Sequence, residues 1–411
     1  MKSIFRNFIY TMLILLGMAS CDQLEFETEL ETEEEEQQVI TTCERTVLVY
    51  IAADNSLASY HQGDINEMLE GAGNIPNDCR LLAYIDDYSL PRIISIEQKN
   101  GKPKTKTLQQ YTDEHNSGDV KTLRSVMQWV VKNAPARSYG LVLWSHGTSW
   151  LPTKAPAQRA ICVDSKSGGS WMDIAEIAEV LTQFPHLDFI LFDACFMQAA
   201  EVAYELREVT DYIIASPAEI PGPGAPYHRL VAPMFATPTN ADSIAKEYYL
   251  EYEENNIYVQ GEGSDCFGVC LSVVDCKQLD SLATMTNEMI QKYNNPESSV
   301  KLSEVQQYYP YSNSTSTPEY YDMNGYMSRL ITDPADYARW RGALDAAVPS
   351  KYTTDQWFSS YVGIYGGPLD VDTENYGGIS CYIPKVGRNE LNKAFRTTTW
   401  YNVGGWKQIG W

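Results

Sequence analysis

The central part of the chain alternates short, continuously apolar runs with longer stretches in which apolar residues recur at helical spacing. Four of the runs are rich in β-branched and large apolar residues, which favours buried strands: Thr46–Ala52, Leu81–Ile85, Gly140–Trp144 and Phe189–Phe192. Helical spacing is found at Ile65–Ala72, Leu123–Val131, Met172–Leu181 and from about Phe196 onward. Strands that alternate with helices predict an α/β fold, a three-layer α/β/α sandwich with a mostly parallel central sheet.

The pattern becomes weaker beyond about Pro233. Helices are expected at Ile244–Tyr252 and Leu279–Tyr293, strands at Phe267–Val274 and Ile379–Ile383, and a loop at Gln306–Tyr326, where Tyr, Ser, Asn and Pro are dense. We therefore expect a core over residues 45–235 and a C-terminal α/β region over residues 236–411 packed on it, which either extends the sheet or forms a smaller module.

The first residues have the features of an export signal. Lys2 and Arg6 precede the apolar run Phe8–Leu16, and small residues lead into Cys21. This order resembles a bacterial lipoprotein processing site, which implies that residues 1–20 are removed, that Cys21 is acylated, and that the protein is anchored in the outer membrane or at the cell surface. An ordinary signal peptide with a chance cysteine is the alternative.

The segment that follows is strongly acidic and predicts an extended tether over residues 21–44. It resembles the surface-export signal of some bacterial lipoproteins, but a plain spacer explains it equally well. The whole chain has a net charge of −23. This charge argues against nucleic acid and anionic membrane surfaces as partners and favours a cationic peptide. We expect a monomer.

The nine cysteines do not form an obvious disulfide scaffold or a paired zinc motif. Cys43 and Cys79 each precede a predicted strand, so a disulfide between them is feasible if those strands are parallel neighbours. The group Cys266, Cys270 and Cys276 is read as buried core.

Two of the predicted strands end in residues suited to cysteine catalysis. Gly140–Trp144 runs into Ser145, His146 and Gly147, and Phe189–Phe192 runs into Asp193, Ala194 and Cys195. The carboxyl ends of parallel strands meet at one edge of a sheet, where such folds bind ligands. Cys195 can serve as the nucleophile and His146 as its base, and the uncovered backbone of Gly147 can donate to an oxyanion. A predicted helix start just after Cys195 would favour its thiolate.

The local sequences LVLWSHGTSW and FILFDACFMQAAEVAYEL, together with TVLVYIAADNSL and IIASPAEIPGPGAPY, resemble the clostripain family within the caspase-like fold. The 49-residue separation of His146 and Cys195 agrees with the spacing of about 50 residues in caspases. Phe196 and Met197 depart from the caspase pattern, which disfavours cleavage after aspartate. The resemblance implies a cysteine peptidase that cuts after Arg or Lys.

By the same resemblance Asp193 matches the acidic residue beneath the first specificity pocket, where a carboxylate would pair with a basic side chain. Its alternative role is to cap the following helix. Glu219, in a Pro- and Gly-rich loop, is a candidate for the same cleft. Some family members cut themselves between the two catalytic residues, so Lys154 and Arg159 are candidate self-cleavage sites.

Other readings remain open. Acidic loops could hold Ca²⁺, a trait of some family members, although no EF-hand spacing is present, and no metal ligands are assigned. A non-catalytic surface lipoprotein that binds glycan or host protein would explain the aromatic content of 12%. A caspase-like peptidase with asparagine specificity is the other alternative.

Overall fold

The computed structural model describes residues 41–150, 160–255, 268–294, 300–309, 320–360 and 367–411. They belong to one compact unit, which spans residues 40–411. Cys21, Lys154, Arg159 and Cys266 lie outside the described residues, as do the signal segment and most of the tether.

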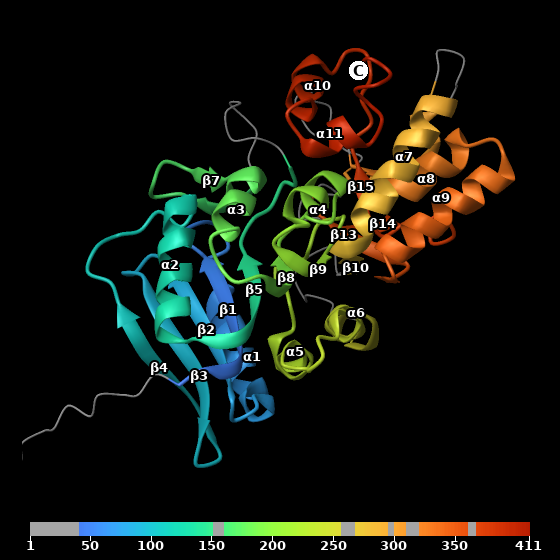
Figure 1. The fold of residues 1–411 in the computed structure, drawn as a ribbon. Helices are drawn as coiled ribbons and strands as arrows, with labels where there is room; N and C mark the ends of the chain where they lie inside the picture. Colours follow the sequence, from blue (N-terminus) through green and yellow to red (C-terminus); the bar gives the residue numbers. More distant parts are fainter. Residues whose placement is uncertain (1–40, 151–159, 256–267, 295–299, 310–319, 361–366) are drawn as a thin grey trace, which may run out of the picture. The chain divides into compact units, whose positions relative to one another are not determined.

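Within the described residues, the unit is built on a sheet of nine strands in the order β12-β10-β9-β8-β5-β1-β2-β3-β4, of which all but β12 are labelled in Figure 1. The five central strands from β9 to β2 are parallel, and β10, β12, β3 and β4 are added antiparallel at the two sides. The strands are β1 (Cys43–Ala52), β2 (Cys79–Asp86), β3 (Arg92–Lys99), β4 (Lys102–Gln110), β5 (Ala136–Trp144), β8 (Leu187–Asp193), β9 (Thr210–Ala215), β10 (Cys270–Asp275) and β12 (Ser350–Thr353).

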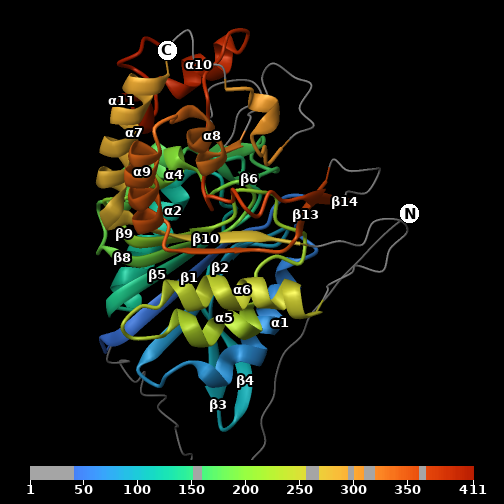
Figure 2. The same cartoon turned by 90° about the vertical axis from the view of Figure 1, so that its right-hand side faces the viewer.

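Helices cover both faces of this sheet (Figure 2). The strand β1 shows why: Val47, Val49 and Ile51 pack in one apolar cluster, whereas Leu48 and Tyr50 pack in the other, because successive side chains point to opposite faces. One face is covered by α1 (His61–Gly71), α5 (Tyr227–Met234) and α6 (Ala241–Asn255); the other by α2 (Val120–Asn133), α3 (Ile174–Leu181), α4 (Ala200–Leu206), α7 (Leu279–Tyr293) and α9 (Pro334–Ala347). The predicted three-layer α/β/α sandwich is confirmed.

Smaller elements surround these layers. Among the described residues, the remaining helices are α8 (Met323–Leu330), α10 (Asn389–Phe395) and α11 (Thr399–Val403), with short 3₁₀ turns at Ala72–Asn74, Cys276–Gln278 and Leu302–Glu304. Three two-stranded sheets pair β6 (Ile161–Asp164) with β7 (Ser170–Met172), β11 (Tyr321–Asp322) with β15 (Ser380–Cys381), and β13 (Gln356–Ser359) with β14 (Gly367–Asp370). Within the described ranges, no helix combines the length and apolarity that crossing a membrane requires.

The helix predicted from Phe196 was placed too early. Phe196 has a φ of 64°, a left-handed conformation that a right-handed helix cannot include, and its N–H donates to Ala218 O at 2.9 Å. Gln198 N–H likewise bonds Ser216 O at 3.0 Å. This stretch therefore runs alongside the chain after β9, and α4 starts only at Ala200.

The loop predicted over Gln306–Tyr326 was wrong at its end. Tyr308 N–H bonds Tyr320 O at 2.8 Å, β11 follows, and α8 starts at Met323. Asp322 caps this helix by accepting from Gly325 N–H at 2.7 Å. The aromatic and polar composition of the segment concealed this start signal.

Of the two cysteine predictions, the disulfide was wrong and the buried cysteines were confirmed. Cys43 and Cys79 do lie on parallel neighbours, but the register pairs Cys79 with Arg45, and both thiols are free. Cys43 instead lies 3.3 Å from Thr46 Oγ1, so the suggested disulfide was wrong. Cys270 and Cys276 are buried, as predicted.

Candidate active site

The site forms where β5 and β8 end side by side. These strands are parallel neighbours, and their register pairs Trp144 with Asp193. His146 and Cys195 each stand two residues beyond that pair, so the sheet delivers both to the same edge. The adjacency of two strands that are distant in sequence thus brings together the imidazole and the thiol that the sequence predicted.

A cleft of about 260 Å³ opens at this edge. Its lining includes His146, Cys195, Asp193 and Glu219, four of the residues proposed from the sequence. The loop after β9 supplies Glu219–Gly222 and Gly224, and Leu57 and Ser360 close other sides. The cleft therefore combines a thiol, an imidazole and two carboxylates.

His146 is half-buried and hydrogen-bonds Ser56, whose Oγ lies 2.8 Å from His146 Nε2. The Trp171 ring lies near it, with ring centroids 6.4 Å apart. Burial lowers the pKa of His146 below its usual range, because an imidazolium is poorly solvated there. The ring is therefore neutral at pH 7, as a general base must be, and Ser56 occupies one of its two nitrogens.

Asn55 fixes the position of Ser56. The Asn55 side chain is buried and donates from Nδ2 to Ala52 O at 2.8 Å and to Val163 O at 3.0 Å. Its Oδ1 accepts from Leu57 N–H at 2.9 Å. The sequence prediction missed Asn55 and Ser56; the available signal was their position directly after a buried strand, where polar residues reach the ligand-binding edge.

The Cys195 thiol lies against the backbone of Ile220. Sγ accepts from Ile220 N–H at 3.3 Å, and its S–H faces Ile220 O at 3.7 Å. Burial, followed by the negative charge of Glu219, raises the pKa of Cys195 to about 12. The resting cysteine is thus a thiol, and forming the thiolate requires a proton acceptor. The predicted helix dipole contributes little, because α4 begins five residues later.

Phe196, the residue after the thiol, links the loops that carry Cys195 and His146. Its ring stacks on Tyr320, with centroids 4.7 Å apart, and Tyr320 OH donates to Thr148 O at 2.9 Å. Thr148 lies two residues beyond His146. The left-handed backbone of Phe196 is held by these contacts, as strained residues at functional sites usually are.

Gly147 lies against the cysteine loop. A Cβ at this position would lie 2.6 Å from Cys195 O, which no side chain could tolerate without backbone movement. Gly147 also forms an isolated antiparallel bridge with Ile161, made by the bonds Thr148 N–H to Ala160 O and Cys162 N–H to His146 O. In this pattern the bridged pair is not itself hydrogen-bonded, so the Gly147 N–H points away from Ile161.

Asp193 is buried beneath the cleft and accepts four hydrogen bonds. Both oxygens accept from Ala225 N–H, at 3.1 and 3.2 Å, and each also accepts from one tyrosine, Tyr248 at Oδ1 and Tyr227 at Oδ2, both at 3.1 Å. Burial raises the pKa of Asp193 to about 6 despite these donors. Asp193 does not cap α4, whose cap position is Ala199.

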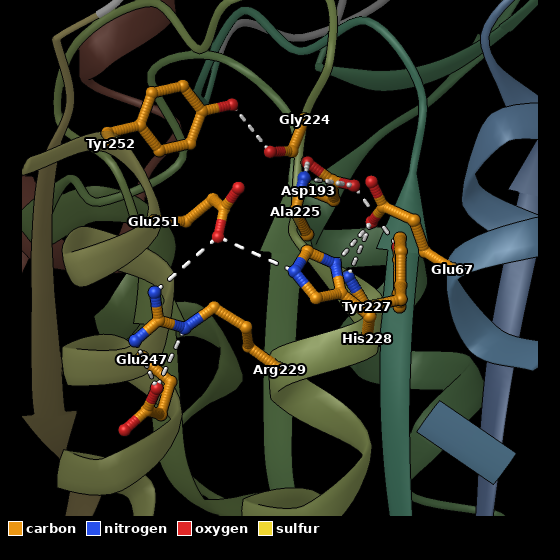
Figure 3. A network of polar contacts seen from close by, with 10 residues as sticks. All are labelled: Glu67, Asp193, Gly224, Ala225, Tyr227, His228, Arg229, Glu247, Glu251 and Tyr252. Atoms are coloured by element: carbon orange, nitrogen blue, oxygen red, sulfur yellow. Dashed lines mark hydrogen bonds and ion pairs between the residues drawn. The ribbon is translucent and has the colours of Figure 1, made fainter. Parts of the chain in front are cut away.

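A second layer of contacts holds the wall beside Asp193 (Figure 3). Tyr227 N–H donates to Glu67 Oε2 at 2.9 Å, and Tyr252 OH donates to Gly224 O at 2.6 Å. His228 lies 3.5 Å from both Glu67 and Glu251. These contacts tie α1, α5 and α6 to the Gly224–Ala225 segment and so fix the donors around Asp193 (Figure 3).

Glu219 faces the same cleft from the loop after β9. Its carboxylate accepts from Ser360 N–H at 2.9 Å and from Ser360 Oγ at 2.5 Å. This pair joins the Glu219 loop to the end of β13. In the described part of the chain, no group of three or more His, Cys, Asp or Glu side chains is arranged to hold a metal ion.

Comparison with known proteins places these features in one family. The model of the clostripain family matches residues 49–340. Clostripain of Hathewaya histolytica is 30% identical over 218 residues, which cover 45% of this chain and 41% of that protein. The match therefore spans about two fifths of the length of that relative.

Solved structures resemble the whole compact unit. A secreted C11 cysteine protease from Bacteroides thetaiotaomicron, in complex with an irreversible peptide inhibitor, is 36% identical with a TM-score of 0.80; 89% of this chain and 99% of that chain are covered. An inactive zymogen C11 protease from Parabacteroides distasonis, at the same coverage, is 33% identical with a TM-score of 0.75.

Proposed function

Because the chain belongs to the clostripain family of cysteine proteases, we propose that it is a cysteine endopeptidase in which Cys195 is the nucleophile and His146 the general base. The observation that carries this proposal is the cleft whose lining brings together the Cys195 thiol, the His146 imidazole and two carboxylates.

The chemistry follows from the resting protonation states. The Cys195 thiol holds its proton, and the neutral His146 can take it, most directly at Nδ1, because Ser56 occupies Nε2. Sγ then attacks the substrate carbonyl, and the oxyanion accepts from the N–H groups of Gly147 and Cys195. His146 returns the proton to the departing amine as the peptide C–N bond breaks. Water, deprotonated by His146, hydrolyses the thioester and regenerates the thiol.

The two carboxylates support a preference for arginine or lysine before the scissile bond. Asp193 and Glu219 both line the cleft, so a cationic side chain bound there would meet two negative charges. In a site shielded from water such an ion pair gains strength. The three donors around Asp193, Ala225 N–H and the hydroxyls of Tyr227 and Tyr248, compensate for burying this carboxylate before any substrate arrives.

Specificity can be tested with peptides that differ only in the residue before the scissile bond: Arg, Lys, Asn or Asp. We expect wild-type protein to cut the Arg and Lys peptides, and Asp193→Asn to lose most of that preference while still cutting slowly. A preference for Asn or Asp would overturn the basic specificity. Glu176→Gln, an exposed change on α3, is the matched control.

Self-processing after Lys154 or Arg159 is a second part of the proposal. Both residues lie between His146 and Cys195 in sequence, and each is a basic site of the kind the cleft should accept. Active protein should appear as two fragments on a denaturing gel, and the double variant Lys154→Ala, Arg159→Ala as one. A single band for active wild-type protein would contradict this proposal.

Anchoring through an acylated Cys21 follows from the lipoprotein-like signal. A relative from Bacteroides thetaiotaomicron is described as secreted. Cells given labelled fatty acid should yield labelled wild-type protein in the membrane fraction, and Cys21→Ala should remove the label. An unlabelled wild type would refute acylation and leave the catalytic proposal unaffected.

A further inference from the structure

The described part of the chain exposes four large apolar side chains, and three of them stand on segments that follow strands at the cleft edge of the sheet. Tyr60, Tyr88 and Leu90 are 41%, 63% and 44% exposed. They belong to the segments that follow β1 and β2, and we call them the rim. The fourth, Val386, is on the segment after β15. Single exposed apolar residues are ordinary, whereas a group beside a cleft indicates binding.

Polar contacts join the two rim segments into one surface. Tyr88 OH donates to Asn55 O at 3.0 Å, and His61 Nε2 lies 3.2 Å from Asp87 Oδ2. Arg92 Nη2 also lies 2.9 Å from Asp87 Oδ2, so the negative charge of this carboxylate is compensated. Lys166 Nζ lies 5.9 Å from the centroid of the Tyr88 ring and helps to hold it.

The rim is continuous with the cleft. A Cβ built on Gly222, a cleft-lining residue, would lie 2.6 Å from the Tyr60 ring, so this ring stands directly against the cleft wall. Leu57, three residues before Tyr60, lines the cleft itself. Tyr88 OH donates to the backbone oxygen of Asn55, and the next residue, Ser56, hydrogen-bonds His146.

The order of the strands assigns the rim to one side of the scissile bond. Cys195 follows β8, His146 follows β5, Ser56 follows β1 and Tyr88 follows β2, and these strands are consecutive in the sheet. In the proposed mechanism His146 gives its proton to the departing amine. The part of the substrate after the scissile bond must therefore leave past His146, on the side where β1 and β2 end.

The spacing of the strands gives the distance from the end of β5, which precedes His146, to the end of β2, which precedes Tyr88. Neighbouring strands are about 4.8 Å apart, so the end of β2 is roughly 10 Å beyond that of β5, and an extended peptide covers this distance in about three residues. We propose that Tyr88 and Leu90 bind an apolar or aromatic side chain two to four residues after the scissile bond. This assignment rests on the proposed endopeptidase function.

The test compares three substrates that share one basic residue before the scissile bond. The first carries Phe or Leu in the second to fourth positions after that bond, the second carries Gly or Ser there, and the third ends in a chromogenic amide. We expect kcat/KM of wild-type protein to be roughly three- to tenfold higher for the first than for the second, the gain typical of an aromatic contact.

Variants of the rim residues test whether these side chains cause the difference in kcat/KM between the first two substrates. Tyr88→Ala and Leu90→Ala should each reduce the ratio of the kcat/KM values for the first and second substrates toward unity. This ratio is the readout, because Tyr88 also contacts Asn55, which positions Ser56, so its loss can change the cleavage of all three substrates alike. Tyr88→Phe keeps the ring but loses the hydrogen bond to Asn55, and it should retain the preference for the first substrate over the second. Val386→Ala is the matched control, because it removes an exposed apolar side chain elsewhere.

The outcomes separate the two proposals. If wild-type protein cleaves none of the three substrates, the endopeptidase proposal fails. If it cleaves the chromogenic amide but treats the other two equally, or if both alanine variants keep the full discrimination, the rim assignment alone is overturned.

Discussion

Ser56 Oγ lies 2.8 Å from His146 Nε2, although ninety residues separate the two in the chain. Where a carboxylate would hold the ring of a catalytic histidine in other hydrolases, a serine hydroxyl does so here. A hydroxyl can accept from Nε2–H, which leaves Nδ1 free to take a proton, and it keeps accepting once the ring is charged.

Replacing Ser56 tests this arrangement. Ser56→Ala removes one hydrogen bond to the ring, so we expect kcat/KM on an arginine peptide to fall about tenfold, or ~1.4 kcal/mol. Ser56→Thr keeps the hydroxyl and should retain most of the activity. Rates measured across pH should also show a lower pKa for the essential base in the alanine variant. Equal rates and equal pH profiles for wild type and Ser56→Ala would exclude this positioning role.

Gly147 should tolerate no side chain. The Cβ of Gly147→Ala would meet the backbone oxygen of Cys195, so relief requires the two catalytic loops to separate. Because this also displaces a proposed oxyanion donor, we expect kcat to fall by about 10²-fold or more. Gly63→Ala, on α1 with open space around its Cβ, is the control and should have wild-type activity. Wild-type kcat in Gly147→Ala would contradict the proposed oxyanion site.

Substrate binding should depend on pH through Asp193. Burial raises the pKa of Asp193 to about 6, so the carboxyl loses its charge as the pH falls through this value. Arginine stays charged over this range, and its attraction to the pocket should therefore weaken in acid. KM for an arginine peptide should rise as the pH is lowered from about 8 to about 5. A citrulline peptide, which has no charge at that position, should show little change, and Asp193→Asn should flatten the arginine profile. A constant KM for arginine in wild type would refute the role of this carboxylate.

The negative charge of Glu219 should make formation of the Cys195 thiolate less favourable. This charge is, after burial, the largest cause of the high pKa of Cys195. Glu219→Gln keeps an oxygen that can accept from Ser360 but removes the charge, so the pKa of Cys195 should decrease. The rate of alkylation by iodoacetamide, followed against pH, should then rise at lower pH than in wild type. An unchanged profile would show that Glu219 does not influence the thiol.

The parallel strands could be predicted because their apolar runs are continuous, as burial on both faces requires. The strand β4 could not, since most of Lys102–Gln110 is polar and exposed at the sheet edge. His146 and Cys195 were recognisable from their positions at strand ends. Asn55 and Ser56 also follow a predicted strand, but their contacts with Val163 and His146 depend on β1 lying next to β5, and local periodicity does not reveal the order of strands in a sheet.

If Cys195 attacks the peptide bond, removing its sulfur must abolish turnover. The most direct measurement compares wild-type protein and Cys195→Ala on the same arginine peptide under reducing conditions, with circular dichroism confirming that both are folded. We predict turnover by wild type and none above background by Cys195→Ala. Equal turnover by the two proteins would show that Cys195 is not the nucleophile.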